Sequence, residues 1–234
     1  MNKIFLWQDP LSWPKDWPHF KCEPDDPVLE SYREQLRLDY SAIRCFHGVR
    51  TSDIESYFTS GLKINDSNTL ISKLKSLFDI EIFQTFSECE IDQAIITVGN
   101  SDQDKSYLTL DHRNLTENSG HYLIYGSEFI LNVATELLKD QIFKFHDYLK
   151  TIGKPTILEI DLPINYVSSN ELNQLSWNII STHPKNKTSP IIDFTIVLHK
   201  SLHNEFIIGH QHPKRIMDYH NGGDYYYWKK PEGT

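Results

Sequence analysis

The chain has 234 residues, of which 39% are hydrophobic and 12% aromatic, enough to build one domain or one domain with an extension. Its formal net charge of −9 argues against a surface built to hold nucleic-acid phosphates, although a few local Arg and Lys residues can still bind a small anion. No stretch approaches the roughly 18–20 apolar residues of a membrane span, so we expect no membrane partner.

The cysteines and the first residues of the chain indicate in which cellular compartment the protein is found. Three cysteines, Cys22, Cys45 and Cys89, have no paired spacing and predict neither a disulfide framework nor a zinc site. The apolar start of the chain ends at Gln8, which is too early for a signal peptide. We therefore expect a reduced, cytoplasmic protein, or one that is exported by a route without an N-terminal signal.

Residues 1–41 are predicted to form an aromatic arm followed by a helix. The arm is rich in prolines, which disfavour a helix, and it carries three tryptophans, Trp7, Trp13 and Trp17. We expect the arm to lie over the main domain, and the alternative is an arm that binds a partner protein. Asp26 as N-cap and Pro27 in the first turn predict the start of the helix.

Residues 42–51 predict a strand that leads into a turn. Ala42–Phe46 is apolar apart from Arg44, which is typical of a short buried strand. The strand runs into His47 and Gly48, where a missing Cβ would let a ligand approach the backbone closely.

A short helix and a second strand are expected next. Thr51 or Ser52 can cap the helix, whose apolar stripe consists of Ile54, Tyr57 and Phe58. Gly61 is predicted to end the helix, and residues 62–64 to return as a strand.

The remaining elements indicate an α+β fold. Residues 65–100 are predicted to form a helical insertion, in which Ser87 and Glu90 make a capping-box pattern. The later elements are expected to be a strand at 106–111, a polar loop at 114–120, a helix capped by Ser127, a helical piece at 142–149, a strand at 156–163, a helix capped by Ser169, strands at 191–199 and 205–209, and an edge element at 213–217. The aromatic tail, 221–234, has no assigned structure.

Three places along the chain resemble, in order, the motifs of ADP-ribosyltransferases of the diphtheria toxin and poly(ADP-ribose) polymerase type. The first is the strand with His47-Gly48, the short helix and Gly61-Leu62. The second is Tyr107 in Tyr-Leu-Thr-Leu-Asp, followed by the segment 121–127 that leads into a helix. The third is Asn204-Glu205-Phe206-Ile207-Ile208 with the segment 213–216. The likeness covers roughly residues 42–218, and the helices at 65–100 and 139–153 depart from it.

The resemblance implies a split, mixed or antiparallel β-sheet core with helical insertions over residues 42–220. It also implies a catalytic triad of His47, Tyr107 and Glu205, with NAD as the substrate. His47 would donate a hydrogen bond to a ribose hydroxyl, and the backbone of Gly48 would meet the carboxamide. The nicotinamide would lie beside Tyr107 and further residues from the second motif, namely Tyr122 or Tyr125 and Ser127.

The chemistry explains why a carboxylate is needed. Breaking the nicotinamide–ribose bond develops positive charge on the ribose, as in glycoside cleavage. A carboxylate sheltered from water stabilises that charge, and it can accept a proton from the incoming nucleophile. Glu205 is the only carboxylate in the apolar stretch 205–209. We therefore expect His47 and Glu205 to face one cleft.

The function that the resemblance implies is transfer of ADP-ribose from NAD to a macromolecular acceptor, a protein or a nucleic acid. The family often supplies toxins and defence effectors, which can have a partner or inhibitor protein. The alternatives are NAD hydrolysis with water as the acceptor, and a non-catalytic module that binds NAD or ADP-ribose. Three histidines, His210, His212 and His220, have no acidic or cysteine partner at ligand spacing, so we expect no metal.

Overall fold

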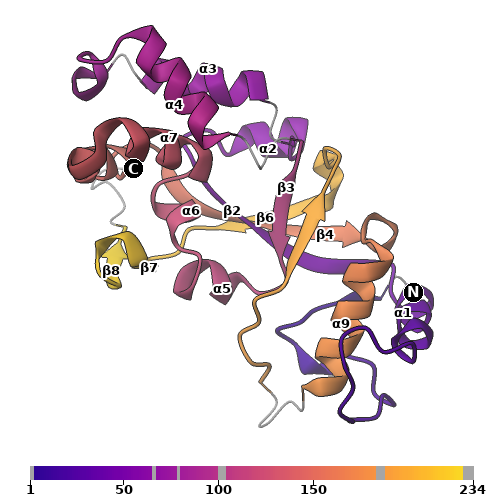
Figure 1. The fold of residues 1–234 in the computed structure, drawn as a ribbon. Coiled ribbons are helices and arrows are strands. Elements are labelled where there is room, and N and C mark those ends of the chain that lie inside the picture. The colour runs from indigo at the N-terminus through magenta and orange to yellow at the C-terminus, as the bar shows by residue number, and fades with distance from the viewer. Residues whose placement is uncertain (1–2, 65–66, 78–79, 100–103, 183–187, 229–234) are drawn as a thin grey trace.

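The computed structural model describes residues 3–64, 67–77, 80–99, 104–182 and 188–228. Its centre is a six-stranded sheet with helices on both faces (Figure 1). The helices are α1 Leu29–Asp39, α2 Glu55–Ser60, α3 Ser67–Leu77, α4 Glu88–Val98, α5 His112–Glu117, α6 His121–Ile124, α7 Glu128–Leu138, α8 Ile142–Leu149 and α9 Ser169–Ser181. The strands are β1 Ile4–Phe5, β2 Ala42–Thr51, β3 Ser106–Thr109, β4 Lys154–Pro163, β5 Thr195–Leu198, β6 Ile207–Gln211, β7 Arg215–Asp218 and β8 Asp224–Tyr227. Antiparallel strands and several helices make the chain an α+β protein.

The main sheet has the strand order β5-β3-β2-β4-β6, and each neighbouring pair on this path is antiparallel. Its longest pair joins β2 to β4, from Ala42 opposite Pro163 to Thr51 opposite Lys154. This pairing extends β2 beyond the predicted strand 42–46, because β4 supplies partners through the His-Gly position to the end of the strand.

One edge of β2 is shared by two short strands. β1 pairs with Ala42 and Ile43 in parallel, and β3 pairs further along at Phe46, opposite Thr109. Beyond Phe46 the described residues form no further ladder pair between β2 and β3. We call this place, where the two strands part, the β2–β3 split.

The two faces of the sheet carry separate apolar clusters. Successive side chains leave opposite faces of a strand, so Ile43 and Cys45 share one face and Phe46 points to the other. The face that carries Ile43 and Cys45, which we call the α9 face, is covered by α1, α9 and the N-terminal arm. The face that carries Phe46, which we call the α6 face, is covered over part of its area by α5, α6 and α7. A candidate site on either face must lie where these covers leave the sheet open.

The N-terminal arm packs on the domain, as predicted. Trp7, Trp13 and Trp17 are all buried, and Trp7 is only 1% exposed. The indole Nε1 of Trp7 donates to the carbonyl oxygen of Pro190 at 2.9 Å, and the rings of Trp7 and Trp13 lie 4.5 Å apart. The arm also contributes β1 and a 3-10 turn at Pro10–Ser12, so it belongs to the core of the main sheet.

The predicted helix starts hold with small shifts. α1 begins at Leu29, two residues after Pro27, because the Asp26 carboxylate accepts from the Val28 N–H ahead of the helix. The capping box of Ser87 with Glu90 is confirmed at the start of α4.

Two serines differ from their predicted roles as caps. Ser127 precedes α7, but its side chain makes no capping hydrogen bond. α9 is capped by Ser168 rather than Ser169, because Glu171 then lies at the position that completes a capping box.

Gly61 ends α2, but residues 62–64 do not return as a strand. They make one isolated bridge, between Leu62 and Leu202. Gly61 has φ of +79°, and a Cβ there would lie 2.1 Å from the Leu202 carbonyl oxygen. Glycine is therefore required both by the backbone conformation and by the close approach of the two segments.

Several later segments differ from the sequence prediction. The expected polar loop at 114–120 begins inside α5, whose N-cap is Asp111. The expected strand at 191–199 is ordered as a strand only over β5. The expected strand at 205–209 begins instead with a 3-10 turn, Asn204–Phe206, which we label η6, and β6 follows it. Part of the aromatic tail forms β8, which pairs with β7 in a hairpin.

The predicted insertion contains α3 and α4, and α4 lies next to α7 (Figure 1). Residues 65–66, 78–79 and 100 of this prediction, and 229–234 of the tail, lie outside the described residues. Within the part of the chain that the structure describes, no helix is long and apolar enough to cross a membrane.

Candidate functional site

His47 lies on β2 at the β2–β3 split. Its ring is half-buried, and Nδ1 lies 2.9 Å from the carbonyl oxygen of Tyr107 on β3. A carbonyl oxygen can only accept, so Nδ1 carries the proton and Nε2 of the neutral ring is left as an acceptor. Burial lowers the pKa of His47, and the hydrogen bond to Tyr107 opposes that shift. The ring is therefore neutral at pH 7, with Nε2 able to accept a proton or a hydrogen bond.

Gly48 is explained by helix packing. An added Cβ would lie 3.1 Å from Cδ2 of Leu115 on α5 and 3.4 Å from Cδ2 of Leu123 on α6. The two leucines occupy the space that the sequence interpretation reserved for a ligand. The missing side chain therefore lets α5 and α6 sit close to β2.

Tyr107 meets His47 through its backbone rather than through its ring. Phe46 and Thr109 are opposite each other, so they share the α6 face, and Tyr107 lies two residues from Thr109 on that same face. His47, next to Phe46, points to the α9 face. The structure therefore brings together the backbone of Tyr107 and the imidazole of His47, while their two side chains leave opposite faces of the sheet.

Glu205 lies apart from both residues. It is part of η6, its side chain is 64% exposed, and its carboxylate is 3.5 Å from Nδ1 of His203. His47 is opposite Leu158, and Leu158 is opposite His210, so His210 is the β6 residue level with His47. Glu205 precedes His210 by five residues and is two strands away from β2, a separation of more than about 10 Å.

The two alternative tyrosines of the second motif have different surroundings. Tyr122 is half-buried, and its hydroxyl donates to the Glu128 carboxylate at 2.9 Å. Tyr125 is buried, and its hydroxyl donates to the carboxylate of Asp218 at 2.6 and 2.8 Å. Burial, and then the Asp218 carboxylate, raises the pKa of Tyr125 above its usual range. Tyr125 thus stabilises the attachment of β7 to α6.

A cluster of titratable groups surrounds Tyr125. Lys150 Nζ is 3.2 Å from the buried Asp218 carboxylate. The rings of His146 and His220 lie 4.6 and 5.5 Å from the Tyr125 ring. Burial is the main cause that lowers the pKa of His146, and the charge of the neighbouring His220 adds to it. The cluster joins α6, α8 and the β7–β8 hairpin.

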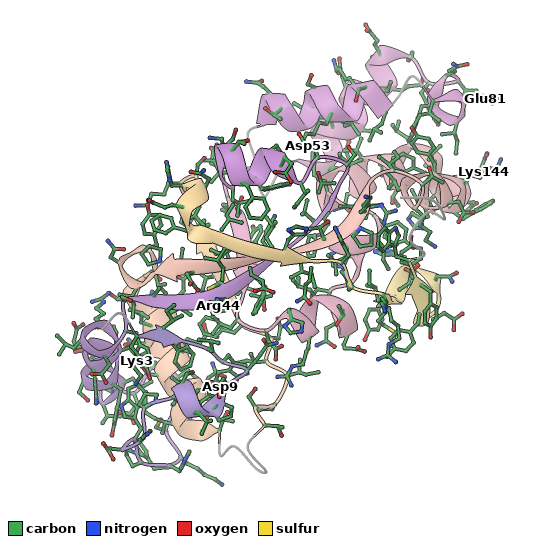
Figure 2. All side chains as sticks on the ribbon, turned by 180° about the vertical axis from the view of Figure 1, so that it is seen from behind. Lys3, Asp9, Arg44, Asp53, Glu81 and Lys144 are labelled. Atoms are coloured by element: carbon green, nitrogen blue, oxygen red, sulfur yellow. The ribbon has the colours of Figure 1, made fainter. Side chains whose placement is uncertain are left out.

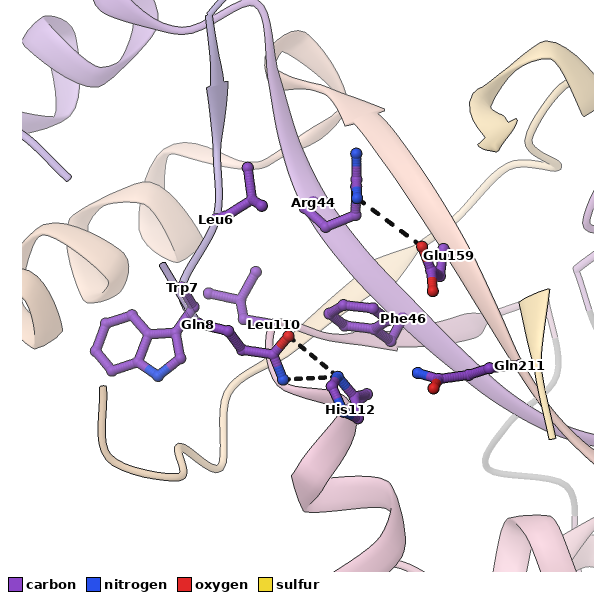
Figure 3. Close-up of a pocket in the computed structure, with 9 residues that line it drawn as sticks. All are labelled: Leu6, Trp7, Gln8, Arg44, Phe46, Leu110, His112, Glu159 and Gln211. Atoms are coloured by element: carbon purple, nitrogen blue, oxygen red, sulfur yellow. Dashed lines mark hydrogen bonds and ion pairs between the residues drawn. The ribbon is translucent and has the colours of Figure 1, made fainter. Parts of the chain in front are cut away.

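A pocket of about 220 Å³ opens on the α6 face, at the end of β1 (Figure 3). Its polar lining consists of Gln8, Arg44, His112, Glu159 and Gln211, and Phe46 supplies an aromatic wall. Figure 2 shows Arg44 on the sheet beside the arm residues Lys3 and Asp9, far from Glu81 and Lys144 at the other end of the molecule. Of these lining residues, only Arg44 and Phe46 belong to a motif that the sequence interpretation singled out, since both lie in the strand that leads into His47.

Charged pairs fix the floor of this pocket. Arg44 Nε donates to Asp161 at 2.5 Å, and another nitrogen of Arg44 lies 3.9 Å from the Glu159 carboxylate. The three side chains share one face because Arg44 is opposite Asp161, and Glu159 precedes Asp161 by two residues. A sequence signal existed in the alternation Leu-Glu-Ile-Asp-Leu, which predicts two carboxylates on one face of an otherwise apolar strand.

The pocket wall is completed by a histidine and two amides. Nδ1 of His112 is within 2.7–3.0 Å of the Gln8 amide group, and burial lowers the pKa of His112. Gln211 of β6 lies across the pocket, and its amide has no hydrogen-bond partner among the described residues. Gly209 leaves the Glu159 carboxylate uncovered, since an added Cβ would lie 3.7 Å from Oε2.

The described residues contain no group of three or more His, Cys, Asp or Glu side chains that could hold a metal ion. Comparison with known proteins gives no match: no family model, no curated protein and no solved structure matches the chain. Inferences on function therefore depend on the residues and their geometry.

Proposed function

We propose that the chain is an ADP-ribosyltransferase that cleaves NAD, releases nicotinamide and passes ADP-ribose to a macromolecular acceptor. The observation that carries the proposal is the hydrogen bond between His47 and the Tyr107 carbonyl at the β2–β3 split. It joins the first two of the three motifs, which lie 60 residues apart in the sequence. The α+β content and the antiparallel sheet are compatible with the same family.

The protonation of His47 suits recognition of a ribose. With Nδ1 held by the Tyr107 carbonyl, Nε2 accepts a hydrogen bond from a ribose hydroxyl rather than donating one. The ring stays neutral at physiological pH because its burial disfavours the charged form. A fixed tautomer gives the hydroxyl one defined partner and orients the sugar for cleavage.

Glu205 is the carboxylate that the resemblance names. Its exposure means that it meets the ribose only if NAD itself covers η6, or if η6 moves toward β2. Asn204 restrains such a movement, because its side-chain amide donates to the Phe58 carbonyl oxygen of α2 at 2.7 Å. If η6 moves, α2 must therefore move with it.

The experiment measures nicotinamide release from NAD with purified protein, with and without candidate protein and nucleic-acid acceptors. Glu205→Gln should lower turnover about 10²–10³-fold with little change in NAD affinity, because it removes a charge that acts in the transition state. His47→Ala should weaken both NAD binding and turnover. Glu34→Gln is the matched control, since Glu34 is 52% exposed and also has basic neighbours, Arg33 and Arg37.

The outcomes separate the alternatives. No nicotinamide release by the wild-type chain with any acceptor would refute the transferase proposal. Full turnover by Glu205→Gln would show that another carboxylate acts. Release that yields free ADP-ribose and modifies no acceptor would identify water as the acceptor.

A second candidate function is binding of NAD or ADP-ribose without cleavage. The exposed position of Glu205, more than about 10 Å from His47, favours it, since binding needs no carboxylate at the ribose. NAD binding measured by calorimetry, lost in His47→Ala and present without nicotinamide release, would support this candidate.

A further inference from the structure

We propose that the pocket around Glu159 binds one neutral, polyhydroxylated ring, a sugar of pentose or hexose size. This site is independent of the proposed NAD-cleaving function, because it lies on the α6 face whereas His47 points to the α9 face. The juxtaposition that carries the inference is a half-buried carboxylate, a guanidinium and two amides around an aromatic wall in about 220 Å³ (Figure 3).

The charges in the pocket disfavour ionic ligands. Arg44 is already neutralised by Asp161 at 2.5 Å, and Glu159 adds a second carboxylate 3.9 Å from the same guanidinium. Arg44, Asp161 and Glu159 together carry a formal charge of −1, which repels a phosphate or a carboxylate. A cation beside Glu159 would meet the positive charge of Arg44. A neutral ligand avoids both penalties.

The hydrogen-bonding groups match hydroxyls. Glu159 can only accept, Arg44 can only donate, and the amide of Gln211 can do both, whereas the amide of Gln8 already contacts Asp111 and His112. A ligand that satisfies all of them must itself donate and accept, which each hydroxyl group does. Phe46 can pack against the C–H face of a sugar ring.

The directions of these groups argue for a sugar rather than a flat heterocycle. Gln8 comes from the arm, Arg44 from β2, Glu159 from β4 and Gln211 from β6, so polar atoms surround the pocket. A planar amide or base presents its polar atoms in one plane. A saturated ring projects hydroxyls in several directions, and its size fits a pocket that is below the range of about 300–1,000 Å³ for drug-sized ligands.

Two features leave the Glu159 carboxylate free to accept a hydrogen bond from a ligand. Its carboxylate is 32% exposed, and its only ion-pair partner among the described residues is Arg44 at 3.9 Å, beyond hydrogen-bond distance. The absence of a side chain at Gly209 leaves the space beside Oε2 open. A hydroxyl donating to this carboxylate would form a charge-assisted hydrogen bond, which is shorter and stronger than a neutral one.

The test is ligand-observed saturation-transfer NMR on the full chain with D-ribose, D-glucose and their 2-deoxy forms. Arginine, inorganic phosphate and nicotinamide represent cationic, anionic and planar ligands. We expect one or more of the sugars to bind, and Glu159→Gln to weaken that binding at least about tenfold, as loss of a hydrogen bond to a charged group does. Gly209→Ala should also weaken binding, because the methyl group covers Oε2 without changing any charge.

Glu117→Gln is the matched control, since Glu117 is 29% exposed, has an arginine neighbour and lies at the other end of α5. It should leave sugar binding unchanged, and the thermal unfolding of every variant should be checked for a folded state. Binding that survives Glu159→Gln, or a panel in which no sugar binds, overturns the proposal. Preferential binding of arginine, phosphate or nicotinamide, abolished by Glu159→Gln, overturns the assignment to a sugar.

Discussion

Asp218 joins the C-terminal hairpin to the rest of the protein, and Asp218→Asn tests how much this contact stabilises the fold. The carboxylate is 2% exposed, accepts two contacts from the Tyr125 hydroxyl and lies 3.2 Å from Nζ of Lys150. Asparagine has nearly the same shape, so the change removes the charge without creating a cavity. The hydroxyl can still donate to the amide oxygen, whereas Lys150 loses its counter-charge.

The magnitude follows from this geometry. Removing one partner of a buried ion pair costs about 3–5 kcal/mol, and a hydrogen bond to a charged group contributes roughly 1.5–3 kcal/mol. Lys150 is 23% exposed, so water takes over part of its solvation. We expect Asp218→Asn to lower the free energy of unfolding by roughly 2–3 kcal/mol. For a chain of this length that corresponds to a fall in Tm of roughly 4–12 °C.

Urea denaturation and thermal unfolding, followed by circular dichroism, measure the effect. The control is Asp92→Asn, because Asp92 is 58% exposed and its ion pair with Lys75 should contribute less than about 1 kcal/mol. Lys150→Met should cost less in the Asp218→Asn background than alone, since its partner charge is already gone. Equal stability of Asp218→Asn and Asp92→Asn would refute the reasoning.

Two further predictions concern the arm and two half-buried histidines. Trp7→Ala should lower the free energy of unfolding by about 3–5 kcal/mol in urea denaturation, since the indole is 1% exposed. The control, Leu38→Ala, should change it little, because Leu38 is 86% exposed. Similar effects of the two substitutions would contradict the packing of the arm on the domain. Burial lowers the pKa of His47 and of His146. The unfolded chain therefore takes up protons first as the pH falls below 6.5, and stability is lost toward the folded pKa values. Tm should fall as the pH is lowered from 7.5 to 5.5, and the fall should be less steep in His146→Asn. A Tm that is constant or rises toward acid pH would be inconsistent with neutral, half-buried imidazoles.

The sequence predicted best where local rules and burial agree. A proline-rich arm forms little core of its own, so its tryptophans can be buried only by packing on the neighbouring domain, and they do pack there. The Ser87–Glu90 capping box depends only on residues three apart, so it formed as expected. Pairing between distant strands was harder to predict from the sequence. The length of β2 is set by β4, which begins more than 100 residues later.

The candidate site was harder to predict, because it depends on which face each side chain occupies. The sequence pattern predicts Glu205 in an apolar strand, but β6 begins two residues later, so Glu205 lies in an exposed turn. The need for glycine at position 48 follows only from tertiary contacts, because Leu115 and Leu123 from two helices fill the space beside it. Arg44 and Glu159 come together through register, and a shift of one residue would separate them.

The long-range contacts of the arm also have a consequence for biosynthesis. Trp7 donates to the carbonyl of Pro190, 183 residues later, so the first tryptophans leave the ribosome long before that partner exists. At about 5–20 residues per second the wait lasts roughly 10–40 s. During that time the Trp7 indole lacks this partner and is available to chaperones and to proteases.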